Sequence, residues 1–569
     1  MARPLPSGFP APSIALPALA DKLRQALPQW CMGLEEPGMA RHLAARALLS
    51  GDADLFACGA GLALWTWQRA PLEPERMALL LEALAAFGPS SMSAASPLGA
   101  LSEFLNRLKA GLEGQPDPDE VAALLASGDT GLAVRLLLPR LRDPAQGLGW
   151  LASAWDGMLR LGSQDLCAAA LAACPWPEAF LPLRARLEAE LSFLFDAPET
   201  ALAALDDVDD VLFGAWAEYL RAELLLRLDR GQAGRELLAG CFQAMPWHTH
   251  LGLKLHGLAF PLPVAPPEAA NDAVILVYSW NKAALVRQTL ESLARTDIAG
   301  ARIVALDNGS TDGTGNGDGT GETMEQCRAL FAPGAMSVVR LPVNIGAPAA
   351  RNWLLSLPEV RERAWAVFLD DDVLLPERWL LRLLGAGRAE ERAGAVGCRI
   401  VSASRPVCLQ SADYQLFRPG TGARTFEGRP DLVNVFDNCS GGLDFGLFSY
   451  ARPAAHVSGC CHALRMSVLP ELGGFDIAFS PTQFDDLDRD LRSAVAGRGA
   501  VYCGDVAVAH VQHSSLAKAK GTAAIGQVMG NKLKLEGKYA QADLEAVSEA
   551  GMNALWADLA AKWAALAEV

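Results

Sequence analysis

Trp365-Ala-Val-Phe-Leu-Asp-Asp-Asp-Val-Leu-Leu-Pro376 is an apolar run that ends in three consecutive carboxylates. Val367 to Leu369 are predicted to form a strand buried on both faces of a parallel sheet, because a short apolar run that stops abruptly at charge is typical of such strands. Ligands of an open α/β sheet bind at the carboxyl ends of its strands. Carboxylate oxygens at that end suit Mg²⁺ or Mn²⁺ carrying a substrate diphosphate. In isolation, the same cluster would indicate only a solvated acidic turn.

Composition places the chain among folded proteins that act on small molecules. Its 569 residues suffice for two or three domains with separate cores, and 51% hydrophobic with 20% charged residues is the composition of a folded chain. A formal net charge of -16 opposes binding to nucleic acid and to anionic membranes, because both are negatively charged. We therefore expect a small-molecule substrate, brought in through a metal ion.

The cysteines and the first residues indicate a cytoplasmic protein. The 12 cysteines are scattered and form no C-x-x-C pair, which favours reduced thiols over a disulfide framework. The start, Met1-Ala-Arg-Pro-Leu-Pro6, lacks the basic start and the continuous apolar core of a signal peptide. No run of about 18 uncharged apolar residues is present, so we expect no membrane span.

The first part of the chain, residues 1–260, is expected to be all-α, because Ala and Leu recur in it at helical spacing. Turn-forming residues interrupt it at a regular step: Gly128, Gly162 and Asp196 are 34 residues apart, and Asp229 follows 33 residues later. This period resembles that of tetratricopeptide repeats, in which two helices and their turn form one repeat. The alternative is a plain helical bundle in which such turns recur by chance.

The periodicity changes after a proline-rich stretch. Residues 261–271 hold four prolines within seven residues, which predicts a stiff linker. Beyond it, expected strands alternate with expected helices: strands over 273–278, 302–307 and 337–341, and helices over 282–294, 322–331 and 348–357. This alternation predicts a doubly wound, mainly parallel α/β sheet over residues 272–515. Residues 516–569 are expected to form a helical tail.

Six short motifs follow one another in the α/β part of the chain. They are Val277-Tyr-Ser-Trp-Asn281-Lys282, Leu306-Asp307-Asn-Gly-Ser-Thr-Asp312-Gly-Thr314, Asn344-Ile-Gly346 with Ala350-Arg351-Asn352, Leu369-Asp-Asp-Asp372, Leu472-Gly-Gly-Phe-Asp476 and Phe484-Asp-Asp-Leu-Asp488. In this order they resemble the family 2 glycosyltransferases of the GT-A fold. Each motif alone is weak, whereas six in order are specific. The resemblance covers residues 272–515 and implies transfer of a sugar from a nucleoside-diphosphate sugar.

The resemblance also implies a donor site at the strand ends. It assigns donor and nucleotide binding to Tyr278, Trp280, Asn281, Asp307, Asn308, Arg351, Asp370 and Asp371. A carboxylate such as Asp307 can accept the ring N–H of a base, and the planar donors of the Arg351 guanidinium suit anionic oxygens. An ordinary surface ion pair is the other role open to Arg351.

Mn²⁺ or Mg²⁺ is implied as the cofactor. Asp372 of the D-x-D element is expected to be the direct ligand, together with Asp370 and the late histidine His510. We prefer His510 to His513, because His510 directly ends an apolar run. The ion would neutralise charge that develops on the leaving diphosphate.

The catalytic base is assigned to Asp486, with Asp485 as the alternative. Phe484-Asp-Asp-Leu-Asp488 stands where the family carries Glu-Asp-x-Asp, and the replacement of Glu by Asp leaves the choice between the two open. We expect the like charges of Asp485 and Asp488 to raise the pKa of Asp486 toward a useful range. The competing hypothesis is that the three carboxylates cap a helix that starts at Leu487.

These observations predict a metal-dependent, inverting glycosyltransferase. Its acceptor can be a saccharide, a lipid-linked molecule or a protein, and the helical part of the chain is expected to bind the acceptor or a partner. A sugar-nucleotide pyrophosphorylase is one alternative, but it would need a glycine-rich, basic loop after the first strand, and Tyr278 to Lys282 is not one. A helical scaffold with an inactive transferase domain is another, but the carboxylates are intact.

Overall fold

The structure is a computed structural model that describes residues 4–87, 92–93, 95–112, 116–126, 128–421, 425, 430–511 and 522–568. The chain divides into two compact units. The helical unit comprises Met1–Leu258, Ser404–Val407 and Lys562–Val569, and the α/β unit comprises Ala259–Ala403 and Cys408–Ala561. Among the described residues, no helix combines the length and the apolarity that a membrane span requires.

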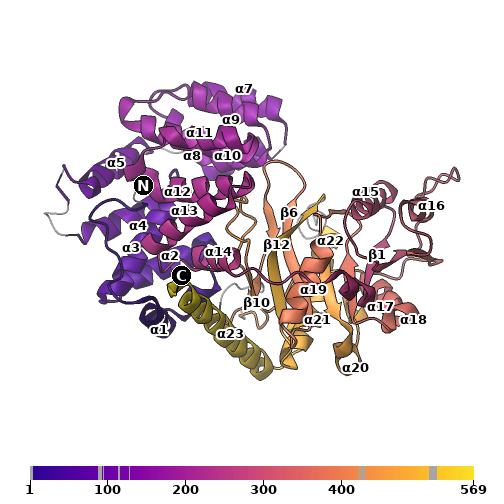
Figure 1. Ribbon diagram of the computed structural model, residues 1–569. Coiled ribbons are helices and arrows are strands. Elements are labelled where there is room, and N and C mark those ends of the chain that lie inside the picture. Colours follow the sequence, from indigo (N-terminus) through magenta and orange to yellow (C-terminus); the bar gives the residue numbers. More distant parts are fainter. Residues whose placement is uncertain are drawn as a thin grey trace. The chain divides into compact units, whose positions relative to one another are not determined.

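The helical unit is built from α-helices joined by short turns (Figure 1). Its elements are α1 Leu16–Ala26, η1 Pro28–Met32, α2 Pro37–Leu48, α3 Ala53–Arg69, α4 Pro74–Ala85, α5 Pro97–Gly111, α6 Pro118–Leu125, α7 Thr130–Leu141, α8 Gly147–Arg160, α9 Gln164–Ala173, η2 Glu178–Phe180, α10 Leu181–Phe195, α11 Pro198–Ala204, η3 Leu205–Asp207, α12 Asp210–Arg227, α13 Gly231–Ala244 and α14 Thr249–Ala259. The all-α character predicted for this part of the chain is confirmed.

The four evenly spaced turn residues each separate two helices. Gly128 lies between α6 and α7, Gly162 between α8 and α9, Asp196 between α10 and α11, and Asp229 between α12 and α13. Gly128, Gly162 and Asp229 have positive φ angles of 68°, 75° and 55°, the left-handed conformation in which many helices end. The helix-turn-helix pairs therefore follow the predicted step, while their assignment to the tetratricopeptide class stays a prediction.

Tryptophan side chains form much of the core of the helical unit. Trp67 stacks on Phe213 with ring centroids 5.2 Å apart, and Trp30 meets Trp247 edge to face at 6.2 Å. A Cβ atom at Gly61 would lie 2.6 Å from the Trp247 ring, so only glycine lets this indole approach α3.

The α/β unit contains the strands. They are β1 Ala273–Ser279, β2 Arg302–Asp307, β3 Met336–Arg340, β4 Trp365–Leu369, β5 Val373–Leu374, β6 Ala395–Ser402, β7 Leu409–Ser411, β8 Tyr414–Leu416, β9 Val435–Asp437, β10 Ala451–Ala454, β11 Cys461–Arg465 and β12 Ala500–His510. The main sheet of the described chain has the order β10-β12-β6-β11-β4-β1-β2-β3, with β5 on β12 and β7 on β6, while β8 and β9 pair separately.

The sheet is parallel where the sequence predicted it. β3, β2, β1 and β4 are parallel neighbours, which confirms the doubly wound arrangement. β11 is antiparallel to both of its neighbours, β4 and β6, so the sheet as a whole is mixed. All residues of β4 are buried, as the apolar run before the carboxylates predicted.

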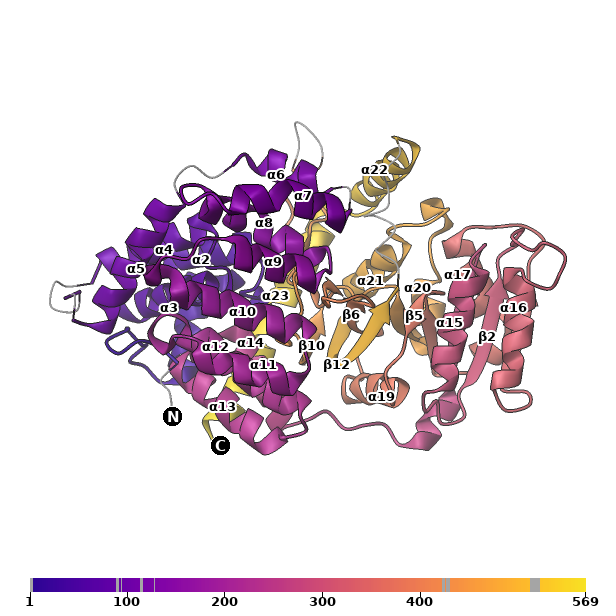
Figure 2. The same cartoon turned by 90° about the horizontal axis from the view of Figure 1, so that it is seen from above.

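Helices cover both faces of this sheet. The helices and turns of the unit are η4 Pro267–Asp272, α15 Ala283–Ala294, α16 Thr320–Cys327, η5 Arg328–Leu330, α17 Ala347–Ser356, α18 Pro358–Arg361, α19 Trp379–Ala389, η6 Met466–Val468, α20 Leu469–Leu472, η7 Ile477–Phe479, α21 Asp485–Val495, α22 Thr522–Glu536 and α23 Gln541–Ala567 (Figure 2). One core cluster joins Ile275 and Val277 of β1 to α15, α16 and α19, and a second joins Val274 and Leu276 to α17. The alternation along β1 is that of a strand buried on both faces.

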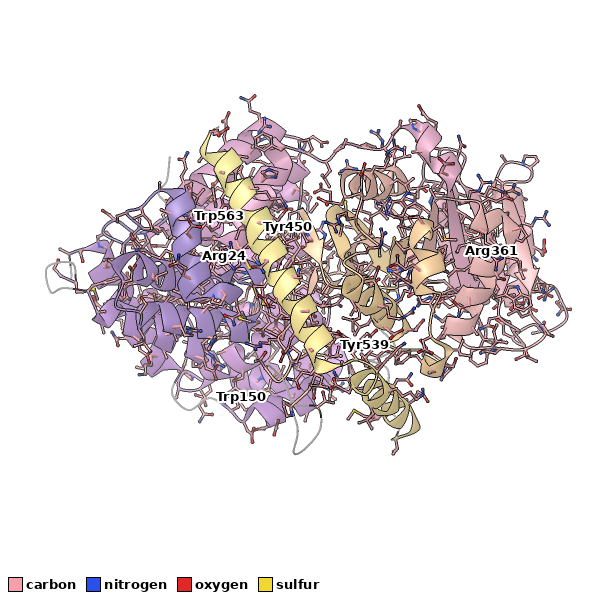
Figure 3. All side chains as sticks on the ribbon, turned by 90° about the horizontal axis from the view of Figure 1, so that it is seen from below. Arg24, Trp150, Arg361, Tyr450, Tyr539 and Trp563 are labelled. Atoms are coloured by element: carbon pink, nitrogen blue, oxygen red, sulfur yellow. The ribbon has the colours of Figure 1, made fainter. Side chains whose placement is uncertain are left out.

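The residues of the long helix α23 are divided between the α/β unit and the helical unit. Its residues as far as Ala561 belong to the former, and the residues from Lys562 onward belong to the latter. Figure 3 labels Trp563 near the end of this helix. Trp563 packs on the Phe242 ring at 6.2 Å, and a Cβ atom at Gly252 would lie 2.4 Å from its indole nitrogen. The tail of the chain therefore contributes to the core of the helical unit.

Candidate active site

Three parallel strands end together at one edge of the sheet. The register pairs Ser279 of β1 with Asp307 of β2, and Val277 of β1 with Leu369 of β4. Asp370 follows β4 directly, so the acidic turn and Asp307 share this edge. Carboxyl ends of parallel strands are where α/β folds bind ligands, so the donor site expected at this edge stays a prediction that the topology allows.

Asp371 is anchored rather than free. Ser279 donates its hydroxyl to Asp371 Oδ2 at 2.6 Å, and Lys282 Nζ lies 2.8 Å from Asp371 Oδ1. Burial raises the pKa of Asp371, and the adjacent Lys282 opposes that rise. These two contacts hold the turn between β4 and β5. Asp371 therefore supports the positions of Asp370 and Asp372 on either side of it.

Asp372 faces His510 across the sheet edge. His510 Nε2 lies 3.0 Å from Asp372 Oδ1, and the Val511 N–H donates to the Asp372 carbonyl at 2.8 Å. Burial acts to raise the pKa of Asp372, but the hydrogen bond and the charge of His510 prevail and lower it. β12 pairs with β5 antiparallel, with His510 opposite Val373, and this register brings the two predicted metal ligands together.

Asp370, Cys460 and His510 form a cluster of potential metal ligands. Their ligand atoms all lie within 4.8 Å of one another. Burial raises the pKa of Asp370 to about 6, and the neighbouring Asp372 charge contributes to the rise. A cation would offset this accumulation of negative charge, and carboxylate with imidazole is a donor set that suits Mn²⁺. Of these residues, the sequence motifs indicated Asp370 and His510 but not Cys460.

Arg351 on α17 is buried and binds a carboxylate of α21. Its Nη1 atom donates to Asp485 Oδ2 at 2.7 Å, and its guanidinium carbon lies 5.3 Å from the Tyr278 ring centroid and 5.0 Å from that of Phe475. Arg351 is 5% exposed, so the ordinary surface ion pair considered from the sequence is wrong. The ion pair joins the predicted donor side of the site to the predicted base motif.

Asp486 is held by backbone groups and is half-buried. The Gly459 N–H donates to its Oδ2 atom at 3.1 Å, and the Leu487 N–H donates to its Oδ1 atom at 2.8 Å. A Cβ atom at Gly459 would lie 2.6 Å from Asp486 Oδ2, so glycine is needed for this approach. α21 starts at Asp485, two residues before the start considered from the sequence.

The expectation that like charges raise the pKa of Asp486 is wrong. Burial acts in that direction, but the positive charges of His456 and Arg351 prevail and lower the pKa. Asp485 is compensated by Arg351, and Asp488 by Lys538 Nζ at 2.7 Å. Because both flanking carboxylates have cations of their own, their repulsion of Asp486 is weak.

Comparison with known proteins agrees with this geometry. Residues 274–473 match the family model described as Glycosyl transferase family 2. The α/β unit carries a family 2 glycosyltransferase domain. No curated protein matches the sequence.

Solved structures similar to the chain are glycosyltransferases as well. GalNAc-T7 with UDP, GalNAc and Mn²⁺ has 11% identity and a TM-score of 0.35, and the match covers 50% of this chain and 55% of that one. Mannosyltransferase PcManGT from Pyrobaculum calidifontis, in complex with GDP-Man and Mn²⁺, has 20% identity over 58% and 85% of the two chains, with a TM-score of 0.33. TarS 1-349 of S. aureus has 16% identity over 48% and 69%, with a TM-score of 0.31. The chain thus spans little more than half of GalNAc-T7.

The predicted fold class, a GT-A α/β domain after an all-α region, is confirmed. In the glycosyltransferase domain, several residues predicted to bind the nucleotide support loops. The Asn281 side chain accepts the Thr311 N–H at 2.7 Å, and Asn308 Oδ1 accepts the Ile345 N–H at 3.1 Å. Trp280 is 49% exposed, which makes it the most exposed side chain of Trp280, Asn281 and Asn308.

Asp307 is occupied within the domain. Its Oδ1 atom accepts the Ser310 N–H at 2.9 Å, and Arg340 Nε lies 3.4 Å from its Oδ2 atom. Arg340 ends β3, opposite Asp307 in the register, and no sequence motif indicated it. Arg340 therefore competes for the Asp307 carboxylate with the N–H group of a nucleotide base, which Asp307 was predicted to accept.

A buried carboxylate behind the base motif was not predicted. Asp490 accepts hydrogen bonds from His456 Nδ1 at 2.8 Å, His462 Nε2 at 3.0 Å and the Val457 N–H at 3.2 Å. The charges and hydrogen bonds of the histidines outweigh the effect of burial and lower the pKa of Asp490 far below its usual range. Asp490 follows Asp486 by one helical turn, a spacing that could have signalled a shared helix face.

The same network sets the charge near Asp486. Burial acts to lower the pKa of His456, but the hydrogen bond to Asp490 prevails and raises it. His456 also stacks on the Tyr414 ring at 5.4 Å, which fixes the imidazole plane. His513, the alternative to His510 as a late histidine, lies outside the described residues.

Proposed function

We propose that this protein is a metal-dependent, inverting glycosyltransferase that moves a sugar from a nucleoside-diphosphate sugar to an acceptor hydroxyl. The observation that carries the proposal is that Asp370 and Asp372, which lie within the residues that match the family 2 model, meet His510 at one strand edge, while Asp486 lies on a separate helix. One group of side chains suits a cation and a diphosphate, and the other supplies a proton acceptor.

The donor side would be held by the acidic turn. Asp372, Asp370 and His510 would hold Mn²⁺ or Mg²⁺, and the ion supplies charge neutralisation to the leaving diphosphate when it is bound. Lys282 contacts Asp371 and Asp372, so it places a further positive charge at the same edge. Tyr278, Trp280, Asn281, Asp307, Asn308 and Arg351 are the proposed lining of the nucleotide site.

The acceptor side would be served by Asp486. The acceptor hydroxyl oxygen attacks the anomeric carbon, the bond from that carbon to the diphosphate breaks, and the hydroxyl proton passes to the Asp486 carboxylate. A lowered pKa keeps Asp486 ionised, as a proton acceptor must be. Asp485 is committed to Arg351 at 2.7 Å, so the contacts favour Asp486 over Asp485 as the base.

The helical residues 1–260 would serve the acceptor. We propose that this helix-rich part, with its regular step of turns, binds the saccharide, lipid-linked or protein acceptor or a partner protein, while residues 272–515 carry out the transfer. The proline-rich residues 261–271 would connect them, and residues 516–569 form the tail. The proposed place of action is the cytoplasm.

Asp486→Asn tests the proposal. Turnover of nucleotide-sugars with Mn²⁺ should fall by about 10²-fold or more, because asparagine cannot accept the proton. Its single carbonyl oxygen keeps one of the two backbone hydrogen bonds that Asp486 accepts. Donor binding by calorimetry should be unchanged. Asp505→Asn, at an exposed carboxylate of β12, is the matched control and should transfer normally. Normal turnover in both Asp486→Asn and Asp485→Asn would remove this motif from the chemistry.

A further inference from the structure

We propose that Cys460 is a ligand of the metal ion in the donor site and that its sulfur makes this site select Mn²⁺ over Mg²⁺. The inference rests on the proposed function, because it takes the ion to be the one that serves the donor. It concerns a residue that no sequence motif indicated as a metal ligand. Three observations support it: the cluster geometry, the backbone that holds it and the chemistry of the donor set.

The cluster is close to the size that one ion requires. The ligand atoms of Asp370, Cys460 and His510 lie within 4.8 Å of one another. Donors bound to one transition-metal ion, with sulfur at about 2.3 Å and nitrogen or oxygen at about 2.1 Å, are at most about 4.4 Å apart. Side-chain shifts of a few tenths of an ångström therefore bring all three to one ion. The thiol and Asp370 are half-buried, so an ion can reach them.

The backbone places Cys460 beside Asp370. The Asp370 N–H donates to the Cys460 carbonyl at 3.0 Å. The antiparallel register of β11 with β4 pairs Cys461 with Leu369, so the residues before β11 and after β4 are also neighbours. Both potential ligands thus stand at the end of a strand pair in the sheet, which holds them more firmly than a loop would.

His510 is oriented for ligation. Its Nδ1 atom lies 2.7 Å from Gln410 Oε1, an oxygen that accepts hydrogen bonds, so Nδ1 carries the proton. The Nε2 atom lies 3.0 Å from Asp372 Oδ1, where it donates a hydrogen bond, so its proton must leave before Nε2 can bind a metal ion. Metal-binding histidines usually donate their second ring nitrogen to an oxygen, as Nδ1 does here.

The donor set decides between the metals. Mg²⁺ demands oxygen ligands and keeps several waters, whereas imidazole and thiolate favour transition metals. A site that adds an imidazole and a thiol to its carboxylates therefore favours Mn²⁺ over Mg²⁺. On binding, the thiol proton is released to solvent and the sulfur forms the bond as a thiolate.

Cobalt spectroscopy tests the bond directly. The full-length protein titrated with Co²⁺ should develop a thiolate-to-cobalt charge-transfer band in the near ultraviolet. Cys460→Ser should lose this band, while visible ligand-field bands show that Co²⁺ still binds. Cys408→Ser, at the other half-buried cysteine of the described chain, is the matched control and should retain the band. A wild-type complex without the band, or a band that persists in Cys460→Ser, would overturn the inference.

Metal selectivity provides a second measurement. Calorimetry with Mn²⁺ alone should show a loss of affinity of about tenfold or more in Cys460→Ser, with little change for Mg²⁺. Equal changes for both metals would also overturn the inference. Transfer from a panel of nucleotide-sugars, measured on the same wild-type preparation, separates the two proposals. Transfer without the cobalt band refutes only the role of Cys460, and the band without any transfer refutes only the proposed function.

Discussion

Replacing Arg351 by methionine should destabilise the glycosyltransferase domain in a pH-dependent way. Arg351 is 5% exposed and Asp485 is 3% exposed, and their side chains pair at 2.7 Å. Methionine keeps much of the arginine volume and can still pack near Tyr278 and Phe475. It removes the charge that compensates Asp485 inside the domain.

The magnitude follows from the burial of the pair. Removing one partner of a buried ion pair costs about 3–5 kcal/mol, because it leaves a buried charge without compensation. Burial already raises the pKa of Asp485, and the loss of Arg351 raises it further. A carboxyl whose pKa is raised on folding stabilises the folded state as pH falls, because the folded state binds the proton more tightly. The penalty is therefore largest above the raised pKa of Asp485 and shrinks as the solution becomes more acidic.

Hydrogen exchange resolves the effect by region. A loss of about 3–5 kcal/mol corresponds to exchange roughly 10²- to 4 × 10³-fold faster for the slowest amides of β1 and β4 near neutral pH. Peptides from α12 of the helical unit provide the internal reference. Arg302→Met, at an exposed arginine of β2, is the matched control and should leave both sets unchanged.

The double variant identifies the cause. Arg351→Met combined with Asp485→Asn should recover most of the lost protection, because no unpaired charge remains. Unchanged exchange in Arg351→Met would refute the reasoning from the buried pair. A loss of the same size at acidic and neutral pH would show that packing, and not the charge of Asp485, is responsible.

The other predictions concern the site and the division of the chain. Gly459→Ala should lower turnover about tenfold or more in steady-state assays, because the new Cβ atom would lie 2.6 Å from Asp486 Oδ2; normal turnover would contradict the close approach. Asp372→Asn should abolish Mn²⁺-dependent binding of nucleoside diphosphate in calorimetry while the melting temperature stays near that of the wild type, and unchanged affinity would remove Asp372 from the metal site. A fragment of residues 266–561 should bind nucleotide and slowly hydrolyse donor yet lose transfer to the physiological acceptor; full transfer would leave the helical unit without the proposed role. His456→Gln should shift the acid limb of the kcat/KM profile to higher pH, because the charge of His456 lowers the pKa of Asp486, and a limb that stays in place would contradict that coupling.

The sequence predicted the strand edge because the edge depends on local patterns. Apolar runs gave β1, β2 and β4, of which β2 and β4 stop at charge, and the expected third strand over 337–341 differs from β3, Met336–Arg340, by one residue. α16 starts at Thr320, two residues before the expected helix over 322–331. Here the Thr320 N–H and hydroxyl both donate to Asp312, a tertiary contact that helix propensity does not contain.

The partners of the site residues could not be predicted, because they depend on pairings between distant strands and helices. Lys282 and Asp371 are 89 residues apart, and Arg351 and Asp485 are 134 residues apart. Cys460 reaches Asp370 only because β11 inserts antiparallel between β4 and β6, and no motif marks that insertion. The sequence thus indicated the acidic residues of the candidate site, but not which basic residues pair with them.

The base motif shows why this distinction matters for mechanism. In the sequence, Asp485, Asp486 and Asp488 form a run of like charges, and repulsion within the run would raise the pKa of each. In the folded domain α21 turns them in different directions, so that Asp485 meets Arg351 and Asp488 meets Arg492 at 3.0 Å. Asp486 instead accepts two backbone N–H groups and is half-buried, so lone pairs of its carboxylate remain for an incoming hydroxyl. In the proposed mechanism, the base is therefore the acid whose neighbours are neutralised by other parts of the chain.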